Sequence, residues 1–178
     1  IPDSLYLEIP TQARLYAEAI RIIAEKAPLR ILAGEMLAGA ATLKEAATHS
    51  VPVLKCSSVS HTTIGFEKVL KCGYKGIRAE IEERLFRGGL DIDGADLLRQ
   101  MLSCLDSAKT WHGRYAKELE RLSENSSESE KDAYLKVLES MRNVPENPPQ
   151  NFREAGQALW RLWDFQRLCG NWSGIGRI

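Results

Sequence analysis

The sequence predicts a mainly α-helical protein, and three observations support this. Apolar residues recur every three or four positions along most of the 178 residues, which is the spacing of one helix face. Residues that cap helices, such as Thr11 and Asn151, stand directly before these periodic stretches, and Pro28 and the pair Gly88 and Gly89 stand directly after them. With 44% hydrophobic and 27% charged residues, the composition is that of a globular protein.

The first four periodic stretches predict four helices in order. One helix is expected between Thr11 and Pro28, a second from residue 62 or 63 to Gly88, and a third from about residue 94 to 122. The polar sequence SENSSESEK is expected to form a hinge between helices. A shorter fourth helix then carries its apolar residues on one side, namely Tyr134, Val137, Leu138 and Met141.

The fifth helix follows a proline-rich connector. The sequence NVPENPPQ predicts a rigid extended segment, because proline cannot continue a helix. Asn151 then caps the last helix, and Glu154 occupies the carboxylate position of a capping box. This helix is apolar around most of its circumference, which predicts burial on several sides.

Two segments do not have the helical period. Residues 29–54, LRILAGEMLAGAATLKEAATHSVPVL, are expected to form an irregular segment with one or two short strands. The closing sequence GNWSGIGRI has the composition of a turn that leads into a buried strand. An apolar helix followed by such a strand needs more protein around it than four amphipathic helices provide. We therefore expect the chain to be incomplete.

The composition argues against several classes of function. The 24 basic residues balance the 24 acidic ones, so no global field favours nucleic acid or an anionic membrane. No apolar run approaches the roughly 20 residues that span a bilayer, and the first residues do not form a signal peptide. Four widely spaced cysteines, Cys56, Cys72, Cys104 and Cys169, favour reduced thiols over disulfides or zinc. These features predict a cytoplasmic protein without a bound metal.

A search for chemical motifs finds no activity. The chain contains no P-loop, dinucleotide fingerprint, HExxH or GxSxG sequence. His112 lies on the apolar line of a helix and is expected to be a hydrogen-bonded core histidine. His61 is expected in a capping cluster and His49 in a loop. Glu35 and Glu45 have no obvious partner, so no acid/base pair of carboxylates can be assembled.

The tryptophans near the C-terminal end allow two interpretations. Trp160, Trp163 and Trp172 stand beside Arg161 and Arg167, a combination that can stack the bases of single-stranded nucleic acid. The helical spacing and the zero net charge favour core packing instead.

Three stretches, taken in order, point to a family. They are RILAGEMLAGAATLKEA, SHTTIGFEKVLKCGYKGIRAEIEERL and VPENPPQNFREAGQALWRLWDFQRLCGNWSGIGRI. Together they resemble the N-terminal portion of a glycyl radical enzyme of the pyruvate formate-lyase type. The residues that match the family's patterns are Ile31, Gly34, Glu35, Gly39, His61, Phe66, Glu67, Val69, Leu70, Gly73, Tyr74, Gly76, Ile77, Pro149, Asn151, Phe152, Glu154, Ala155, Gln157, Ser173, Gly176 and Arg177.

Two residues depart from the family's pattern. Gly156 stands where a helix-forming leucine or alanine is expected, at a cost of about 0.5–1 kcal/mol to the helix. Arg161 interrupts an apolar stretch.

The resemblance implies a fold. Residues 1–178 would be the N-terminal helical layer of the family's ten-stranded α/β barrel, as an incomplete pyruvate formate-lyase-type domain. GNWSGIGRI resembles the connection into the first barrel strand, where this chain is truncated. Ser173 and Arg177 match the strand that lines the family's active-site cavity and are therefore the predicted substrate-binding residues. Strand pairing and structural hydrogen bonding are the alternative role for them.

The resemblance also implies a chemistry for the complete enzyme. The family stores a radical on a backbone glycine near its C-terminus and passes it to a cysteine in the barrel, whose thiyl radical attacks a small-molecule substrate. Neither radical residue is assigned here, because Cys72 to Tyr74 read CGY within a helical stripe and the other cysteines do not match either. We expect no catalytic residue, bound cofactor or activity in this chain alone. The complete enzyme would be a homodimer whose radical is installed by a radical-SAM activase with a 4Fe-4S cluster.

The reaction within the family stays open from the sequence. Formate acetyltransferase is one candidate, and a dehydratase or other carbon–heteroatom lyase is another, because the residues that select substrate lie mostly downstream. A free-standing, non-enzymatic helical interaction module is the alternative from another class. It predicts a polar surface on the last helix, which the sequence contradicts. A single-stranded nucleic-acid binder would bind oligonucleotides in a salt-sensitive way, and we expect none.

Overall fold

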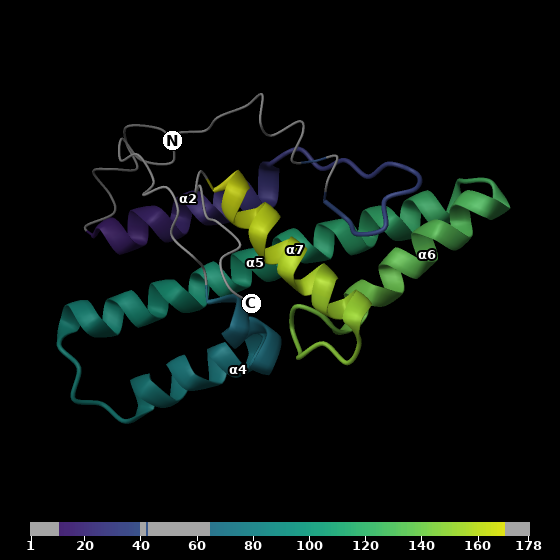
Figure 1. Cartoon of the computed structure of the whole chain (residues 1–178). Helices are drawn as coiled ribbons and strands as arrows, with labels where there is room; N and C mark the ends of the chain where they lie inside the picture. Colours follow the sequence, from purple (N-terminus) through teal and green to yellow (C-terminus); the bar gives the residue numbers. More distant parts are fainter. Residues whose placement is uncertain (1–10, 40–41, 43–64, 170–178) are drawn as a thin grey trace.

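A computed structural model describes residues 11–39, 42 and 65–169 of the chain. Within these residues the protein is all helical and contains no strand (Figure 1). The labels follow Figure 1, and the elements are α2 (Gln12–Lys26), α4 (Phe66–Phe86), α5 (Ile92–Glu124), α6 (Glu128–Asn143) and α7 (Phe152–Leu168).

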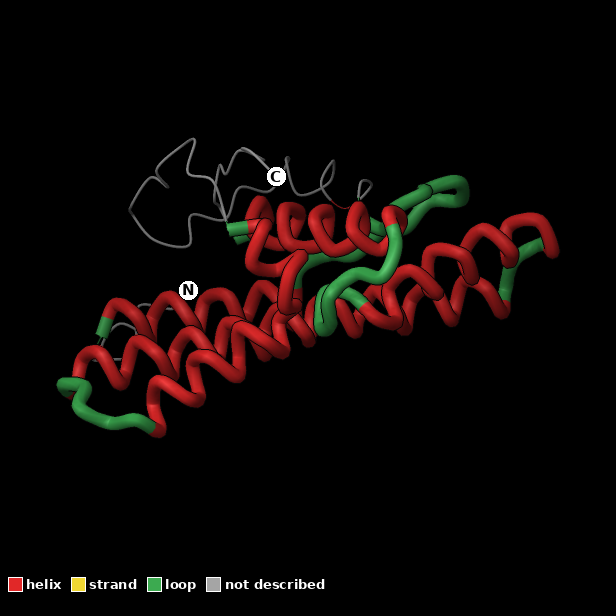
Figure 2. The backbone as a smooth tube through the Cα atoms, turned by 60° about the horizontal axis from the view of Figure 1, so that its bottom comes forward, coloured by secondary structure: helices red, strands yellow, loops and turns green. Residues whose placement is uncertain are grey.

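The 33-residue helix α5 is the element around which the others are arranged. Helices α2 and α6 pack along α5, α4 folds back beside it, and α7 lies against α4, α5 and α6 (Figures 1 and 2). Trp111 of α5 lies at the centre of the core. Its ring meets Tyr115 edge to face at 5.1 Å and stacks on Phe165 of α7 at 6.2 Å between centroids. These two contacts join the longest helix to the last one.

The predicted helix caps are confirmed. The Thr11 side chain accepts a hydrogen bond from the Arg14 amide at 3.2 Å, and Asn151 accepts one from the Glu154 amide at 2.9 Å. The Glu154 carboxylate accepts from the Gln150 amide at 2.9 Å and from the Asn143 side chain at 2.7 Å. Glu154 therefore ties the connector and the end of α6 to the start of α7.

Two predicted boundaries were wrong. Helix α5 continues to Glu124 and α6 begins at Glu128, so only residues 125–127 separate them where a nine-residue polar hinge was expected. Ser127 and Glu130 form a capping box at the start of α6. Serine and glutamate also favour helix starts, so polarity alone did not mark a hinge. The second helix begins at Phe66 instead of residue 62 or 63, because Gly65 has a non-helical backbone.

Helix α4 has a break that its continuous apolar stripe does not reveal. Gly73 has φ +63° and ψ −179°, a combination that essentially only glycine adopts. After this break the Tyr74 amide donates to the Pro145 carbonyl at 2.9 Å and the Lys75 amide to the Glu146 carbonyl at 3.0 Å. A Cβ at position 73 would lie 2.4 Å from that Glu146 oxygen. Gly73, which belongs to the second matched stretch, thus lets the proline-rich connector (residues 143–150) pack against α4.

The irregular segment is described only in part. Residues 29–39 form turns and no strand, so the expected short strands are absent there, and residues 43–54 lie outside the described residues. From Glu154 to Leu168 every residue of α7 is buried or partly buried, as the apolar circumference predicts, whereas Phe152 in the first turn is 94% exposed. The prediction that α7 is buried on several sides was therefore wrong for its first turn.

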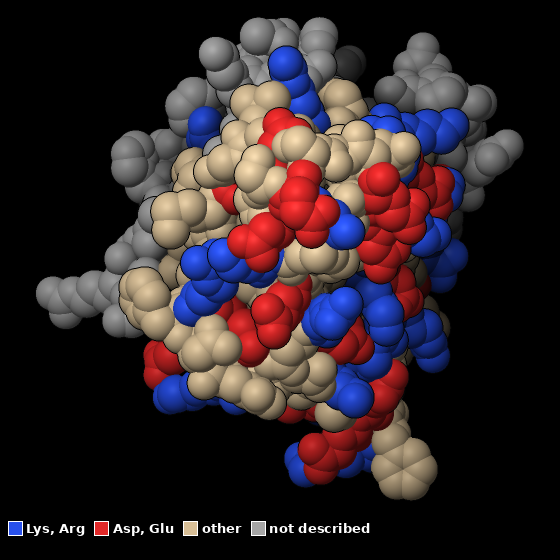
Figure 3. All heavy atoms as spheres, turned by 90° about the vertical axis from the view of Figure 1, so that its right-hand side faces the viewer, with Lys and Arg blue, Asp and Glu red and all other residues tan. Residues whose placement is uncertain are grey.

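The surface charges and the helix lengths bear on the two functions that the composition argues against, binding to nucleic acid and to membranes. On the face that Figure 3 shows, Lys and Arg side chains are interspersed with Asp and Glu side chains. None of the helices in the described part of the chain is long and apolar enough to cross a membrane.

Candidate functional site: a buried polar junction on α7

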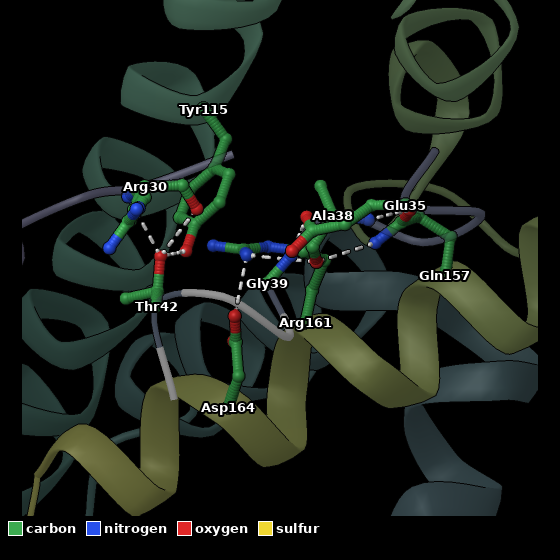
Figure 4. A network of polar contacts seen from close by, with 9 residues as sticks. All are labelled: Arg30, Glu35, Ala38, Gly39, Thr42, Tyr115, Gln157, Arg161 and Asp164. Atoms are coloured by element: carbon green, nitrogen blue, oxygen red, sulfur yellow. Dashed lines mark hydrogen bonds and ion pairs between the residues drawn. The ribbon is translucent and has the colours of Figure 1, made fainter. Parts of the chain in front are cut away.

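The predicted substrate-binding residues Ser173 and Arg177 lie outside the described residues, as does His61. The structure does describe helix α7, which leads directly to the first two. The buried face of α7 carries three polar side chains, Gln157, Arg161 and Asp164. They lie against the loop of residues 29–39, which includes the first ten residues of the first matched stretch (Figure 4).

Gln157 makes a two-way contact with the backbone of this loop. Its side-chain oxygen accepts from the Ala38 amide at 3.1 Å, and its side-chain nitrogen donates to the Ala38 carbonyl at 3.5 Å. Both groups are buried and lie 119 positions apart in the sequence. Gln157 belongs to the third matched stretch and Ala38 lies within the first, so the structure brings these two stretches together.

Arg161 and Asp164 form an ion pair inside the protein. Arg161 Nη1 lies 2.5 Å from Asp164 Oδ2, and the two side chains are 1% and 0% exposed. The same Nη1 donates to the Ala38 carbonyl at 3.3 Å. The guanidinium carbon also lies 3.6 Å from the centre of the Tyr115 ring and 5.6 Å from that of Trp111, within the range of a cation–π contact.

The pKa values around the junction are set mainly by burial. Loss of solvation raises the pKa of Asp164 above its ordinary value, while the neighbouring Arg161 charge opposes that shift. Burial likewise raises the pKa of Tyr115 to about 12, so this hydroxyl stays protonated. The Tyr115 hydroxyl donates a hydrogen bond to Thr42 Oγ1. Thr42 in turn accepts from the Arg30 amide at 3.0 Å and donates to the Arg30 carbonyl at 3.0 Å.

The loop approaches α7 so closely that it needs glycine at position 39. Gly39 has φ +131°, and a Cβ there would lie 2.5 Å from Asp164 Oδ2 and 3.0 Å from Trp160 Nε1. The Glu35 carboxylate accepts from the Gly39 amide at 3.4 Å. The described part of the first matched stretch, residues 30–39, is therefore a loop that lies closely against α7.

Sequence reasoning missed this junction. Arg161 was noted only as a misfit in an apolar stretch, whereas the structure gives it a partner three residues later. The i, i+3 spacing of Arg161 and Asp164 was a signal for an ion pair, but it did not show that the pair is buried. The preference for core packing of the tryptophans fits Trp163, which packs against the core, while Trp172 lies outside the described residues.

His112 is a hydrogen-bonded histidine of the interior, as predicted. Its Nε2 lies 2.9 Å from the Met141 carbonyl. Burial, aided by the Arg161 charge, lowers the pKa of His112 to about 4, so the ring is neutral at pH 7. The described cysteines Cys72, Cys104 and Cys169 are free thiols. Among the described residues no group of three or more His, Cys, Asp or Glu side chains is placed to hold a metal.

Comparison with known proteins identifies the family. The family model described as "Pyruvate formate lyase-like" matches residues 55–171, which is most of the chain. The chain belongs to the pyruvate formate lyase-like family. An isethionate sulfite-lyase from Oleidesulfovibrio alaskensis is 32% identical to it over 111 residues, or 58% of this chain. The chain spans 13% of the length of that relative.

Two solved structures show the same fold. The B12-independent glycerol dehydratase from Clostridium butyricum matches 95% of this chain and 31% of its own, with a TM-score of 0.76 and 18% identity. A glycyl radical enzyme from Archaeoglobus fulgidus matches 93% of this chain and 31% of its own, with a TM-score of 0.70 and 16% identity. The predicted fold is therefore confirmed: a mainly α chain that corresponds to the N-terminal helical part of glycyl radical enzyme structures.

Proposed function

We propose that this chain is the N-terminal helical part of a longer glycyl radical enzyme that breaks a C–C or carbon–heteroatom bond of a small molecule. The family match over residues 55–171 carries this proposal. The short span relative to the sulfite-lyase supports it, because most of a protein of that size would lie beyond these helices. The chain by itself would bind no cofactor and have no activity, since neither radical residue is assigned in it.

Carbon–heteroatom cleavage is the reaction that most of the relatives' names describe, although one relative is named as an indoleacetate decarboxylase, which breaks a C–C bond. One relative is named as a sulfite-lyase and another as a dehydratase. These names describe the loss of sulfite and the loss of water, and both reactions break a bond from carbon to a heteroatom. Neither relative is named as a formate acetyltransferase. We therefore place a lyase or dehydratase reaction before formate acetyltransferase for this protein.

The proposed partners follow from the same family membership. A radical-SAM activase with a 4Fe-4S cluster would install the glycyl radical, and the complete enzyme would be a cytoplasmic homodimer. Ser173 and Arg177 would contact the substrate. A guanidinium and a hydroxyl together can hold an anionic or hydroxylated small molecule by hydrogen bonds.

The test is made on the complete protein. The full reading frame would be expressed and purified without oxygen, activated with its activase, and examined by electron paramagnetic resonance for a glycyl radical. Turnover would be assayed with isethionate, glycerol, indoleacetate, and pyruvate with coenzyme A. We expect a radical and turnover of isethionate or glycerol, and neither from residues 1–178 alone.

A second step tests the two proposed substrate contacts. In the activated enzyme, Ser173→Ala and Arg177→Lys should each raise KM at least tenfold while the radical content stays the same. Arg121→Ala is the matched control, because Arg121 is exposed and pairs with Glu118 on the surface of α5. A reading frame that ends at residue 178, with a monomeric folded product, would instead support the helical interaction module.

A further inference from the structure

Arg161 joins three parts of the molecule that are distant in sequence. It pairs with Asp164 on its own helix, donates to the Ala38 carbonyl of the loop, and lies over the Tyr115 ring of α5. Figure 4 shows the guanidinium between these groups. The contacts with Ala38 and Tyr115 lie on other elements and have preferred directions, so they fix the rotation and height of α7 against the loop and α5. Asp164 holds the guanidinium in the orientation that makes both contacts.

Stability alone does not account for a charged pair at this place. Among the residues that the structure describes, Arg161 Nε, Arg161 Nη2 and Asp164 Oδ1 are buried without a hydrogen-bond partner, and such atoms disfavour the folded state. Well-packed apolar side chains in place of a buried ion pair are often neutral or stabilising. What apolar side chains at positions 161 and 164 cannot supply is the second hydrogen bond from α7 to the Ala38 carbonyl, which Arg161 donates beside the one from Gln157.

The pair lies near the C-terminal end of α7, just before the segment that contains Ser173 and Arg177. Asp164 lies in the last two turns of the helix, which ends at Leu168. The chain continues from there toward Ser173 and Arg177. A change in the rotation of α7 would therefore change the point and direction from which the following residues start.

We propose that Arg161 and Asp164 are a positioning pair: they lock α7 to the loop of residues 29–39 and so set where Ser173 and Arg177 meet the substrate. This inference rests on the proposed function, because it assigns the two downstream residues to the substrate site. Arg161 and Asp164 act through other residues and do not themselves touch the substrate.

The test compares activated full-length enzyme with the double variant R161M/D164L. Methionine keeps an unbranched side chain, leucine keeps the branch point of aspartate, and both charges are removed together, so neither charge is left buried alone. We expect the glycyl radical content to stay within twofold of wild type and KM for the turned-over substrate to rise at least tenfold. Asp164→Asn, which keeps Arg161, is the second variant and should raise KM at least threefold. Arg121→Ala is the control and should leave KM unchanged.

Hydrogen exchange on the same full-length proteins provides a readout that does not depend on turnover. In the double variant the amides of Ala38 and Gly39 should exchange at least tenfold faster, while those in the middle of α5 and α6 should be unchanged. Unchanged exchange at Ala38 and Gly39 would overturn the proposal. Faster exchange with an unchanged KM would also overturn it, because the pair would then hold the loop without positioning the site.

The proposed function can fail separately. A wild-type enzyme that gains no radical and turns over no substrate contradicts the proposed function. The substrate role proposed for Ser173 and Arg177 would then be wrong as well. A wild-type enzyme that is active, with an R161M/D164L variant that matches it in KM, contradicts only the positioning role.

Discussion

The turn between α4 and α5 and the junction on α7 are held in opposite ways. At the turn, Phe86 and Ile92 are 91% and 87% exposed, and the nearby ion pair of Arg87 and Glu83 joins neighbours on the surface of one helix. At the junction, buried side chains reach a loop more than 100 positions away in the sequence. The turn depends on local helix preferences, whereas the junction depends on the tertiary structure.

This difference predicts where substitutions will matter. Surface ion pairs contribute at most about 1 kcal/mol, since water solvates both charges well. A buried charge that loses its partner has no such compensation. The two regions should therefore respond very differently to equivalent substitutions.

The largest expected effect is from Arg161→Met alone. It leaves Asp164 buried without a counter-charge, and we expect the free energy of unfolding to fall by about 3–5 kcal/mol. Urea denaturation followed by circular dichroism measures this. Arg87→Met, at the exposed pair, is the matched substitution and should change the value by less than about 0.5 kcal/mol. Equal losses at the two positions would show that the junction is no more sensitive than the turn.

Gly73→Ala should come next. Alanine is strained at φ +63° and ψ −179°, and its Cβ would collide with the Glu146 backbone, so we expect a loss of about 3 kcal/mol. Gly88→Ala, at the exposed turn, is the control. Gly88 also has a positive φ, +67°, but no atom of the described residues lies within 4 Å of the added Cβ, so only the backbone strain of about 1 kcal/mol remains. If both variants lose the same amount, the collision with the connector is not real.

His112 gives the protein a pH dependence on the acid side. Its pKa is lowered to about 4 in the folded state, so the unfolded chain binds a proton more readily between about pH 6.5 and 4. The contribution of His112 to the free energy of unfolding is complete above about pH 6.5. It is lost as the pH falls, and the loss reaches about 2 kcal/mol at pH 5. Burial raises the pKa of Asp164, which acts with the opposite sign.

His112→Gln isolates the histidine contribution. Glutamine can still donate to the Met141 carbonyl but does not titrate. Urea denaturation at pH 7 and at pH 5 should therefore show a smaller acid loss in the variant than in wild type, by about 2 kcal/mol. The same acid loss in both proteins would mean that His112 is protonated in the folded state.

The sequence predicted the parts of the fold that depend on local preferences. The caps at Thr11 and Asn151 and the apolar faces of the helices follow from the residues near them, and the structure confirms them. The end of α5 was predicted two residues early, because helix signals at Ser127 and Glu130 were taken for a hinge. Such errors arise where one residue type suits two neighbouring structures.

The sequence did not predict the contacts between distant segments. Gly73 appeared as one position in a helical stripe because nothing near it shows that the connector supplies carbonyls to its broken turn. Arg161 appeared as a misfit because its contacts with Ala38 and Tyr115 lie 123 and 46 positions away in the sequence. The resemblance identified the matched stretches, and only the structure shows that Gln157 of one holds Ala38 of another.

The smallest expected effect comes from a glycine on α7, and it is compared with a glycine on the loop that α7 contacts. Gly156→Ala places a Cβ on α7 at 3.7 Å from a Leu37 methyl, an ordinary contact, and alanine favours a helix over glycine by about 0.5–1 kcal/mol. We expect the free energy of unfolding to rise by that amount in urea denaturation. Gly39→Ala, on the other side of the same junction, should lower it, since φ is +131° and the Cβ would lie 2.5 Å from Asp164 Oδ2. A loss at position 156 would mean that α7 and the loop pack more tightly there than the Leu37 distance shows.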